Sequence, residues 1–382
     1  MSRNSSNSTL MDPDELFSSL EALGPEMQLF LVVLYSCTAL AALGGNAAAI
    51  AVLMSGKRRS IRLFLVNLAL SDVTMAVFSI PFTYTDFVLG RWIFLPEFCP
   101  VVQFVQHVSV SVSVYTLTVV GLDRYYAIIY PLSGRWTKVR GRMIIFLIWL
   151  CSIALSSFQL VHGKAERFLV GGQEVYDCNE IWDELDGKVY TSVVFFLTFL
   201  VPMLILSYTY GSIGVRMWAH TTPGNADASR DRQQLVAKMK VVKMMATIVI
   251  LFALCWLPIH IFGLMVYFVP DLVMPIRDED FPGFAAAFLS CHWLSMANSF
   301  VNPLVYCFMS DNFRTDLRNL LHCQRGRERT EHHASTLLTG SSTLKHPIVA
   351  LRVLKQDDDI IVRRSCCKEK NNRPSKKTAT PD

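Results

Sequence analysis

Charged residues are scarce in this sequence. Asp, Glu, Lys and Arg make up only 18% of its 382 residues, whereas hydrophobic residues make up 52%. A soluble globular protein usually carries about 25% charged residues, so the composition argues against that class. The apolar residues are also gathered into long blocks, which indicates a protein that crosses a membrane several times.

The sequence also lacks the patterns of several functional classes. The amino-terminal residues show no basic-then-apolar signal peptide, so the first apolar block is expected to direct insertion. No internal repeat of the kind common in transporters is visible, although a transporter stays open as an alternative function. His162, His260 and His292 lack the spacing of a metal site, and Asp123 beside Arg124 is no nucleophile–base pair. We therefore expect no enzyme.

Seven apolar blocks follow a polar tail. Each is about 20 residues or longer, enough for one helix to cross the hydrocarbon layer. Lys and Arg gather in alternate connections, and basic connections stay in the cytoplasm. The sequence therefore predicts an all-α membrane protein, a multi-pass seven-transmembrane helix bundle of the plasma membrane, with its N-terminus outside and its C-terminus cytoplasmic. The blocks cover residues 27–54, 61–89, 100–123, 142–162, 189–217, 239–269 and 283–309.

The polar tail favours an extracellular end. Residues 1–26 contain two glycosylation sequons, beginning at Asn4 and Asn7. Single sequons often occur by chance, but two in one short tail suit an outer location. We predict an extracellular glycosylated tail over 1–26 and a transmembrane domain over 27–309.

The residues after the last block are less apolar than the blocks before them. Phe313 and Leu317 belong to an apolar stripe at helical spacing, which predicts a short amphipathic eighth helix over 310–323 on the inner leaflet. Cys323 at its end is either palmitoylated or unmodified. Residues 324–382 are mostly polar and predict a disordered cytoplasmic tail.

The third block is rich in polar residues. Polar side chains are costly in lipid unless they face protein or trapped water. We therefore expect this helix to be central, with neighbours on most sides. Its polar residues are Gln106, His107, Ser109, Ser111, Ser113, Tyr115, Thr116 and Thr118.

The second block contains a carboxylate, Asp72, at membrane depth. Such a residue is a functional hypothesis by default. Other polar side chains at similar depth suit either an allosteric sodium ion, which prefers oxygen ligands, or a structural hydrogen-bond network without an ion. No other cofactor is expected. These residues are Asn46, Ser113, Asn298, Ser299 and Asn302.

Prolines interrupt three blocks, at Pro202, Pro258 and Pro303. Each removes a backbone hydrogen bond and can kink its helix. Because Trp256 lies beside Pro258, this kink predicts either an element with two stable arrangements or a static bend.

Cysteines fall into two groups. Five of the ten lie in apolar blocks and are expected to be small buried residues: Cys37, Cys151, Cys255, Cys291 and Cys307. Only Cys99 and Cys178 lie in connections that the charge pattern puts outside.

Short motifs on all seven blocks resemble the signatures of rhodopsin-like (class A) G-protein-coupled receptors. Each motif is weak by itself, but they follow in order and together cover about residues 27–323. They are Asn46 after Gly44-Gly45, Asp72 after Leu-Ala-Leu-Ser, Asp123-Arg124-Tyr125, Trp149, Pro202 with Tyr210, Cys255-Trp256-Leu257-Pro258 and Asn302-Pro303-Leu304-Val305-Tyr306.

The resemblance implies roles for individual residues. Cys99 and Cys178 would form the disulfide that holds the second outer loop to the third helix. Arg124 would be held by Asp123 at rest and released to meet a heterotrimeric G protein. The implied activation switch comprises Asp123, Arg124, Tyr210, Phe252, Trp256, Pro258, Pro303 and Tyr306.

One position departs from the family pattern. Many relatives carry an acid near the inner end of the sixth helix that locks the arginine at rest. Lys238 and Lys240 occupy this region here. Because like charges repel, we expect a weaker resting lock on Arg124.

The outer residues resemble those of neuropeptide receptors. Gln106 replaces the aspartate of amine receptors and, with His260, resembles the neuropeptide Y, tachykinin and luqin/RYamide groups. Acidic outer loops suit a cationic peptide, with an arginine and an amidated aromatic residue at its end. The candidate ligand contacts are Gln106, His260, His292, Asp86, Trp92 and Tyr267, with the acids of the second outer loop.

Alternatives remain at this stage. The loop acids can serve solvation and topology only, and His260 can be a hydrogen-bonded interior residue. A class A receptor for a lipid or small molecule, or a constitutively active orphan, is the alternative function. Arrestin and receptor kinases at the tail and membrane lipids are expected partners, and nucleic acid is not.

Overall fold

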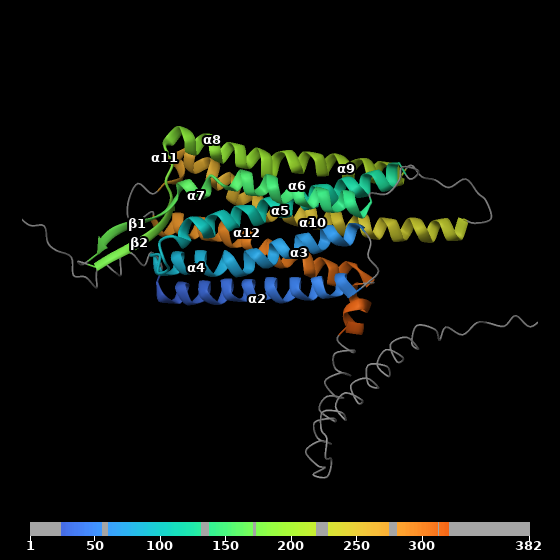
Figure 1. Cartoon of the computed structure of the whole chain (residues 1–382), viewed down its shortest axis with the longest axis horizontal. Coiled ribbons are helices and arrows are strands. Elements are labelled where there is room, and N and C mark those ends of the chain that lie inside the picture. The colour runs from blue at the N-terminus through green and yellow to red at the C-terminus, as the bar shows by residue number, and fades with distance from the viewer. Residues whose placement is uncertain are drawn as a thin grey trace, which may run out of the picture. The chain divides into compact units, whose positions relative to one another are not determined.

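The computed structural model describes residues 24–55, 60–130, 137–170, 173–218, 228–274, 281–311 and 313–320. This part of the chain contains seven helical segments that are long and apolar enough to cross a membrane. The predicted seven-helix bundle is therefore confirmed, and its helices lie side by side (Figure 1). The predictions for Asn4, Asn7, Cys323 and the 324–382 tail concern residues outside the described ranges.

Each predicted block corresponds to one helix or to two or three consecutive helical elements. Residues 313–320 are also helical, as expected within the predicted amphipathic helix. The elements are α2 (Pro25–Ser55), α3 (Ser60–Phe78), α4 (Ile80–Leu89), α5 (Phe98–Ile129), α6 (Lys138–Ser156), α7 (Gln159–His162), β1 (Gly163–Val170), β2 (Gln173–Glu180), α8 (Glu184–Phe195), the π-helix η1 (Phe196–Leu200), α9 (Val201–Trp218), α10 (Ala228–Phe268), α11 (Pro270–Val273) and α12 (Phe281–Met309).

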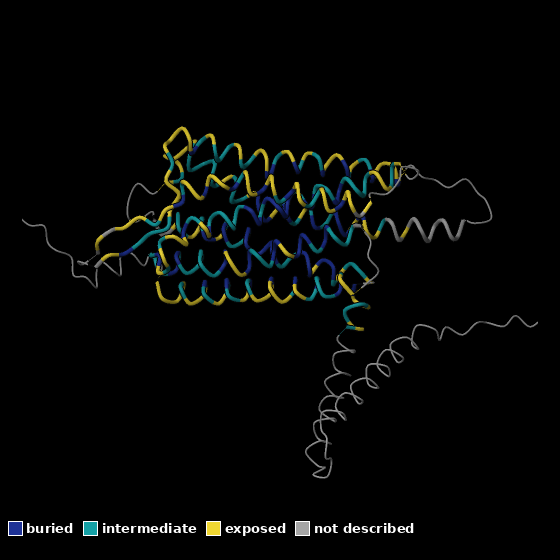
Figure 2. The backbone as a smooth tube through the Cα atoms, viewed as in Figure 1, coloured by how far each residue is buried: buried dark blue, intermediate teal, exposed yellow. Residues whose placement is uncertain are grey.

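The third predicted span, α5, lies at the centre of the bundle. In its most apolar window 61% of the residues are buried, against 22% in α2 and α6, and Figure 2 shows the same gradient. Its polar residues bond to neighbouring helices: Thr116 Oγ1 accepts from Asn67 Nδ2 at 2.8 Å, and Ser113 Oγ lies 2.9 Å from Ser71 Oγ. The polar content predicted this central position because such groups need protein partners.

Prolines in the second, fifth, sixth and seventh spans have different effects on the helix. The second span breaks at Ser79, because Pro81 in the first turn of α4 has no N–H to continue the ladder. The sequence analysis missed this break. In the fifth span the π-helix η1 ends immediately before α9, which contains Pro202, whereas Pro258 and Pro303 lie inside continuous helices.

A β-hairpin covers one end of the bundle, here called the hairpin end. Strands β1 and β2 pair antiparallel, from Gly163 opposite Glu180 to Val170 opposite Gln173. The implied disulfide is present and joins Cys178 of β2 to Cys99 at the start of α5. The hairpin is thus tied to the central helix.

Two predicted burials are wrong. Cys37 and Cys151 are exposed, Cys255 is buried, and Cys291 and Cys307 lie between these classes. The apolar residues of a membrane helix face lipid as well as the core, so apolar context does not by itself indicate burial in the protein.

Gly163 allows the hairpin to approach α5. A Cβ atom at this position would lie 2.8 Å from the backbone oxygen of Gln159 and 3.1 Å from Cα of Pro100. We expect Gly163→Ala to lower the melting temperature of the purified ligand-free protein, because overpacking against backbone costs about 1–3 kcal/mol.

Gly211→Ala is the matched control, since no atom lies within 4 Å of a Cβ there. It adds the same methyl group within α9, where alanine is favoured over glycine by about 1 kcal/mol. Equal melting temperatures for the two variants would contradict the tight contact at Gly163.

Candidate functional site

A cavity of about 750 Å³ lies at the hairpin end. It is lined by residues of α4, α5, β2, α8, α10 and α12. The structure brings five of the six predicted ligand contacts together here and leaves Trp92 out. The five are Asp86, Gln106, His260, Tyr267 and His292.

The side chain of Gln106 in α5 bonds to residues at the break between α3 and α4. Its Oε1 atom accepts hydrogen bonds from Ser79 Oγ at 2.7 Å and from Thr83 Oγ1 at 3.4 Å. Ser79 is fully buried, so water does not bond its hydroxyl group. The carbonyl group of Gln106 therefore serves the fold, while its amide N–H groups remain as donors on a residue that lines the cavity.

His260 lies in an aromatic wall of the cavity. Its ring centroid is 5.1 Å from that of Phe199, 5.8 Å from Phe195 and 6.3 Å from Trp256. Within the described residues it makes no hydrogen bond, unlike the interior histidine considered as an alternative. Trp256 also lines the cavity, and its buried Nε1 atom has no partner.

His292 lines the cavity from α12. Its Nδ1 atom is 2.9 Å from the Tyr35 hydroxyl group, and its buried Nε2 atom has no partner. The rings of Phe87 and Phe288 pack against it, with centroids 5.2 and 5.8 Å away. These phenylalanines were missed at the sequence level, where an apolar residue of a span gives no sign that it faces a cavity.

Three carboxylates line the cavity: Asp86, Asp177 and Glu180. Burial raises the pKa of Asp177, and hydrogen bonds from Asn179 and the backbone of Cys178 oppose this rise. Other loop acids serve local ion pairs instead.

Two such pairs lie near the cavity. Glu174 pairs with Arg167 across the hairpin at 2.7 Å, and Glu184 pairs with Lys188 in α8 at 2.6 Å. None of these four residues lines the cavity. The predicted loop acids therefore fall into two groups: some line the cavity, and others form ion pairs outside its lining.

Trp92 anchors the hairpin. It is only 3% exposed and packs on Cys99 and Val102. Its backbone N–H donates to Tyr176 O at 2.7 Å, and its indole Nε1 donates to Leu95 O at 3.0 Å. Trp92 is thus a buried residue that helps to attach the hairpin to α5.

A stack of rings closes the cavity beside α8. Trp182 lies between His162 and Tyr190, with ring centroids 3.7 and 4.4 Å away. The Tyr190 hydroxyl group accepts from the buried Gln159 Nε2 at 3.0 Å. Sequence reasoning missed this group, although a glutamine at the end of a long apolar block was an available signal.

The polar residues around Asp72 meet in the middle of the bundle. Asp72 Oδ2 accepts from Asn302 Nδ2 at 2.8 Å, and Ser299 O accepts from Asn46 Nδ2 at 2.7 Å. Asn298 is buried nearby in sequence. Buried oxygen atoms fit a hard cation, and the same atoms also form a hydrogen-bond network, so both predictions stay open.

The opposite end of the bundle carries four residues of the predicted switch, Asp123, Arg124, Tyr210 and Tyr306, whereas Trp256 lines the cavity at the hairpin end. Asp123 Oδ2 accepts from Arg124 Nε at 3.1 Å and from Nη2 at 2.5 Å. Tyr210 packs on the cluster of Ile213, Met217 and Val242. Tyr306 in α12 is buried, and its hydroxyl group has no hydrogen-bond partner.

The motifs follow in order along the chain, and they lie on the helices of a seven-helix bundle. A family model described as 7 transmembrane receptor (rhodopsin family) matches residues 45–306. The chain belongs to the rhodopsin family of seven-transmembrane receptors.

The receptor is similar to named neuropeptide receptors. It is 34% identical to the RYamide receptor of Drosophila melanogaster over 282 residues, which are 70% of this chain and 57% of that protein's length. It is 33% identical to the substance-P receptor of Cavia porcellus over 306 residues (78% of this chain, 72% of the relative) and 32% identical to the RYamide receptor of Tribolium castaneum over 306 residues (75% and 79%).

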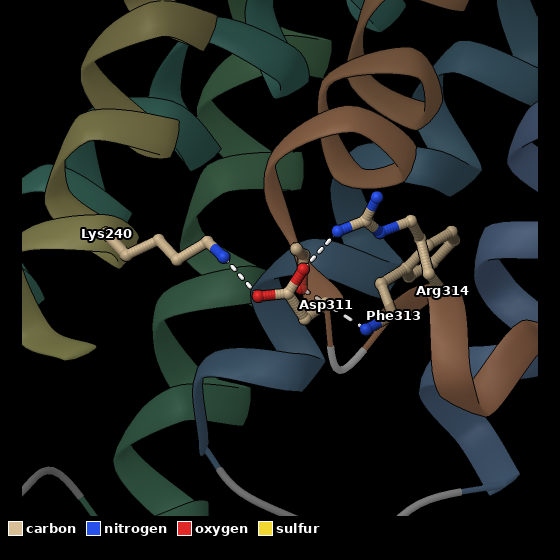
Figure 3. Close-up of polar contacts among 5 residues, drawn as sticks. Lys240, Asp311, Phe313 and Arg314 are labelled. Atoms are coloured by element: carbon tan, nitrogen blue, oxygen red, sulfur yellow. Dashed lines mark hydrogen bonds and ion pairs between the residues drawn. The ribbon is translucent and has the colours of Figure 1, made fainter.

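Lys240 has a partner that the sequence analysis did not foresee. Asp311, after the end of α12, accepts from both Lys240 of α10 and Arg314 (Figure 3). These ion pairs lower the pKa of Asp311. Lys240 is thus paired with Asp311, while the side chain of Lys238 lies outside the described residues, and the predicted weak lock on Arg124 stays a prediction.

The hydrogen bond between Gln106 and Ser79 can be tested without a ligand. Gln106→Leu leaves the buried Ser79 hydroxyl group without its closest acceptor, and we expect a loss of about 1–3 kcal/mol in stability. Thermal unfolding of the ligand-free receptor measures this loss.

Ser79→Ala and the double variant complete the comparison. The double variant should lose less than the sum of the single losses, because both single changes break the same hydrogen bond. Strict additivity would show that the two side chains do not interact.

Proposed function

We propose that this receptor binds an extracellular neuropeptide at the hairpin end and then activates a heterotrimeric G protein. The names of its relatives indicate that they respond to RYamide and to substance P. The proposal places the hairpin end outside the plasma membrane and Arg124 at the cytoplasmic side, as the positive-inside rule favours.

The charge of the cavity lining carries the proposal. Asp86, Asp177 and Glu180 line the cavity, whereas no lysine or arginine is among its described lining residues. A free carboxyl terminus would meet only like charge there, and a neutral carboxamide would not. This supports a cationic, amidated peptide.

Cavity size limits how much of a peptide enters. Sites for small ligands have volumes of about 300–1,000 Å³, and this cavity of about 750 Å³ falls within that range. One end of the peptide therefore fits inside, and the remainder lies along the hairpin. The aromatic walls also suit the alternative, a lipid or small molecule, but three carboxylates oppose an anionic lipid.

The signal passes through α10. Trp256 lines the cavity, and Phe252 packs one turn further in, with ring centroids 6.1 Å apart. A shift of α10 at Pro258 would release Arg124 toward the G protein. Sodium binding at Asp72, and arrestin and receptor kinases at the tail, stay predictions.

A peptide screen tests the proposed function. In transfected cells, at least one cationic peptide with an amidated aromatic terminus should raise calcium or change cAMP. Its free-acid form should be at least about tenfold weaker, because an added like charge costs several kcal/mol. A response to lipids with none to peptides would favour the alternative.

The ion pair of Lys240 and Asp311 is expected to restrain α10 at rest. Exposed ion pairs contribute about 0.2–1 kcal/mol, so Asp311→Asn should raise ligand-independent G-protein activation by up to about fivefold. Lys240→Ala should act alike, and the double variant should add nothing.

Lys243→Ala is the matched control. This exposed lysine lies one turn away on α10, so the variant removes the same charge without breaking the pair. Equal basal activity in the Lys240 and Lys243 variants would contradict a restraining role.

A further inference from the structure

Asp86 is a buried carboxylate without a complete set of partners. It lies in the last turn of α4 and is 9% exposed. Its Oδ1 atom is buried and has no hydrogen-bond partner among the described residues, although the residue lines the cavity. Since leaving a buried charged group unpaired is costly, the position is suited to a partner that arrives from the cavity.

Asp177, which lines the same cavity as Asp86, is held in place by attachments on both sides of it. The preceding residue, Tyr176, accepts a backbone hydrogen bond from Trp92, and the following residue, Cys178, is disulfide-bonded to Cys99. Asn179 also donates to the Asp177 carboxylate. This carboxylate is therefore fixed before any ligand binds, which reduces the entropy that binding would cost.

Both carboxylates line the cavity, Asp86 from α4 and Asp177 from β2. Because both carry the same sign of charge, both favour a cationic partner. The turn that follows α4 begins at Gly90, whose φ of 58° requires the left-handed region that glycine tolerates. Gly90 also lines the cavity, so no side chain of that residue separates a ligand from this wall.

We propose that Asp86 and Asp177 together bind the guanidinium group of an arginine side chain in the peptide. This inference rests on the proposed peptide-receptor function. A guanidinium group is planar, carries five N–H donors and can bond two carboxylates at once, whereas an ammonium group is a strongly hydrated point charge. The pair would thus select arginine over lysine.

A citrulline replacement tests this subsite. The probes are a short synthetic peptide ending in Arg-Tyr-amide and its analogue with citrulline, which keeps the shape of arginine without its charge. On the wild-type receptor in membranes, citrulline should weaken binding by about 10- to 150-fold. On Asp86→Asn and on Asp177→Asn, the two peptides should bind within about threefold of each other.

Glu174→Gln is the control, because Glu174 is a hairpin acid that pairs with Arg167 and does not line the cavity. It should keep the full citrulline penalty. An equal penalty in Asp86→Asn and wild type would overturn the subsite only. Failure of every amidated peptide to bind wild type would overturn the proposed function and the subsite with it.

Thermal stability gives a second readout that needs no peptide. Asp86→Asn removes a buried negative charge whose Oδ1 atom has no hydrogen-bond partner among the described residues, so it should raise the melting temperature of the ligand-free receptor by roughly 2–4 °C. A structural role for Asp86 would lower the melting temperature instead, and that result would contradict the proposal.

Discussion

Lipid offers no hydrogen bonds, so polar side chains inside the bundle bond to their own helix backbone or to a partner from another helix. Asn67 illustrates this requirement: its Nδ2 atom donates to Thr116 of α5, and its Oδ1 atom accepts from Trp149 Nε1 of α6 at 2.8 Å. Ser71 with Ser113 and Asp72 with Asn302 follow the same rule. These pairs fix α5 between its neighbours, and the rest of the bundle is arranged around them.

At the hairpin end the polar groups of the cavity wall are not all paired. Asp86, Trp256 and His292 each have a buried polar atom without a partner among the described residues, and all three line the cavity. A ligand that supplies the missing partners is stabilised there. The hairpin, the disulfide and Trp92 hold one wall of the cavity in place. Another wall belongs to α10, which continues to the opposite end of the bundle.

Much of the fold could be predicted from the sequence, because apolar block length and the placement of Lys and Arg report directly on a membrane. The central place of α5 followed from its polar residues. Five candidate contacts also converge on one cavity, since Gln106 and His260 lie at matching depths of their helices.

Other features depend on contacts that no local pattern encodes. The β-hairpin needs α5 and Trp92 as supports, and the buried Ser79 hydroxyl group needs the acceptor on Gln106 of α5. The pairing of Lys240 with Asp311 joins positions 71 residues apart. Cys37 shows the same limit, because an apolar block does not reveal which of its faces meets lipid.

In the proposed mechanism, occupancy of the cavity moves α10 relative to α5. The most direct test measures the distance between spin labels at Tyr126→Cys of α5 and Val241→Cys of α10, both exposed positions, in a receptor without other reactive cysteines. A saturating amidated peptide agonist should shift this distribution to longer distances. An unchanged distribution with the peptide bound would contradict the account.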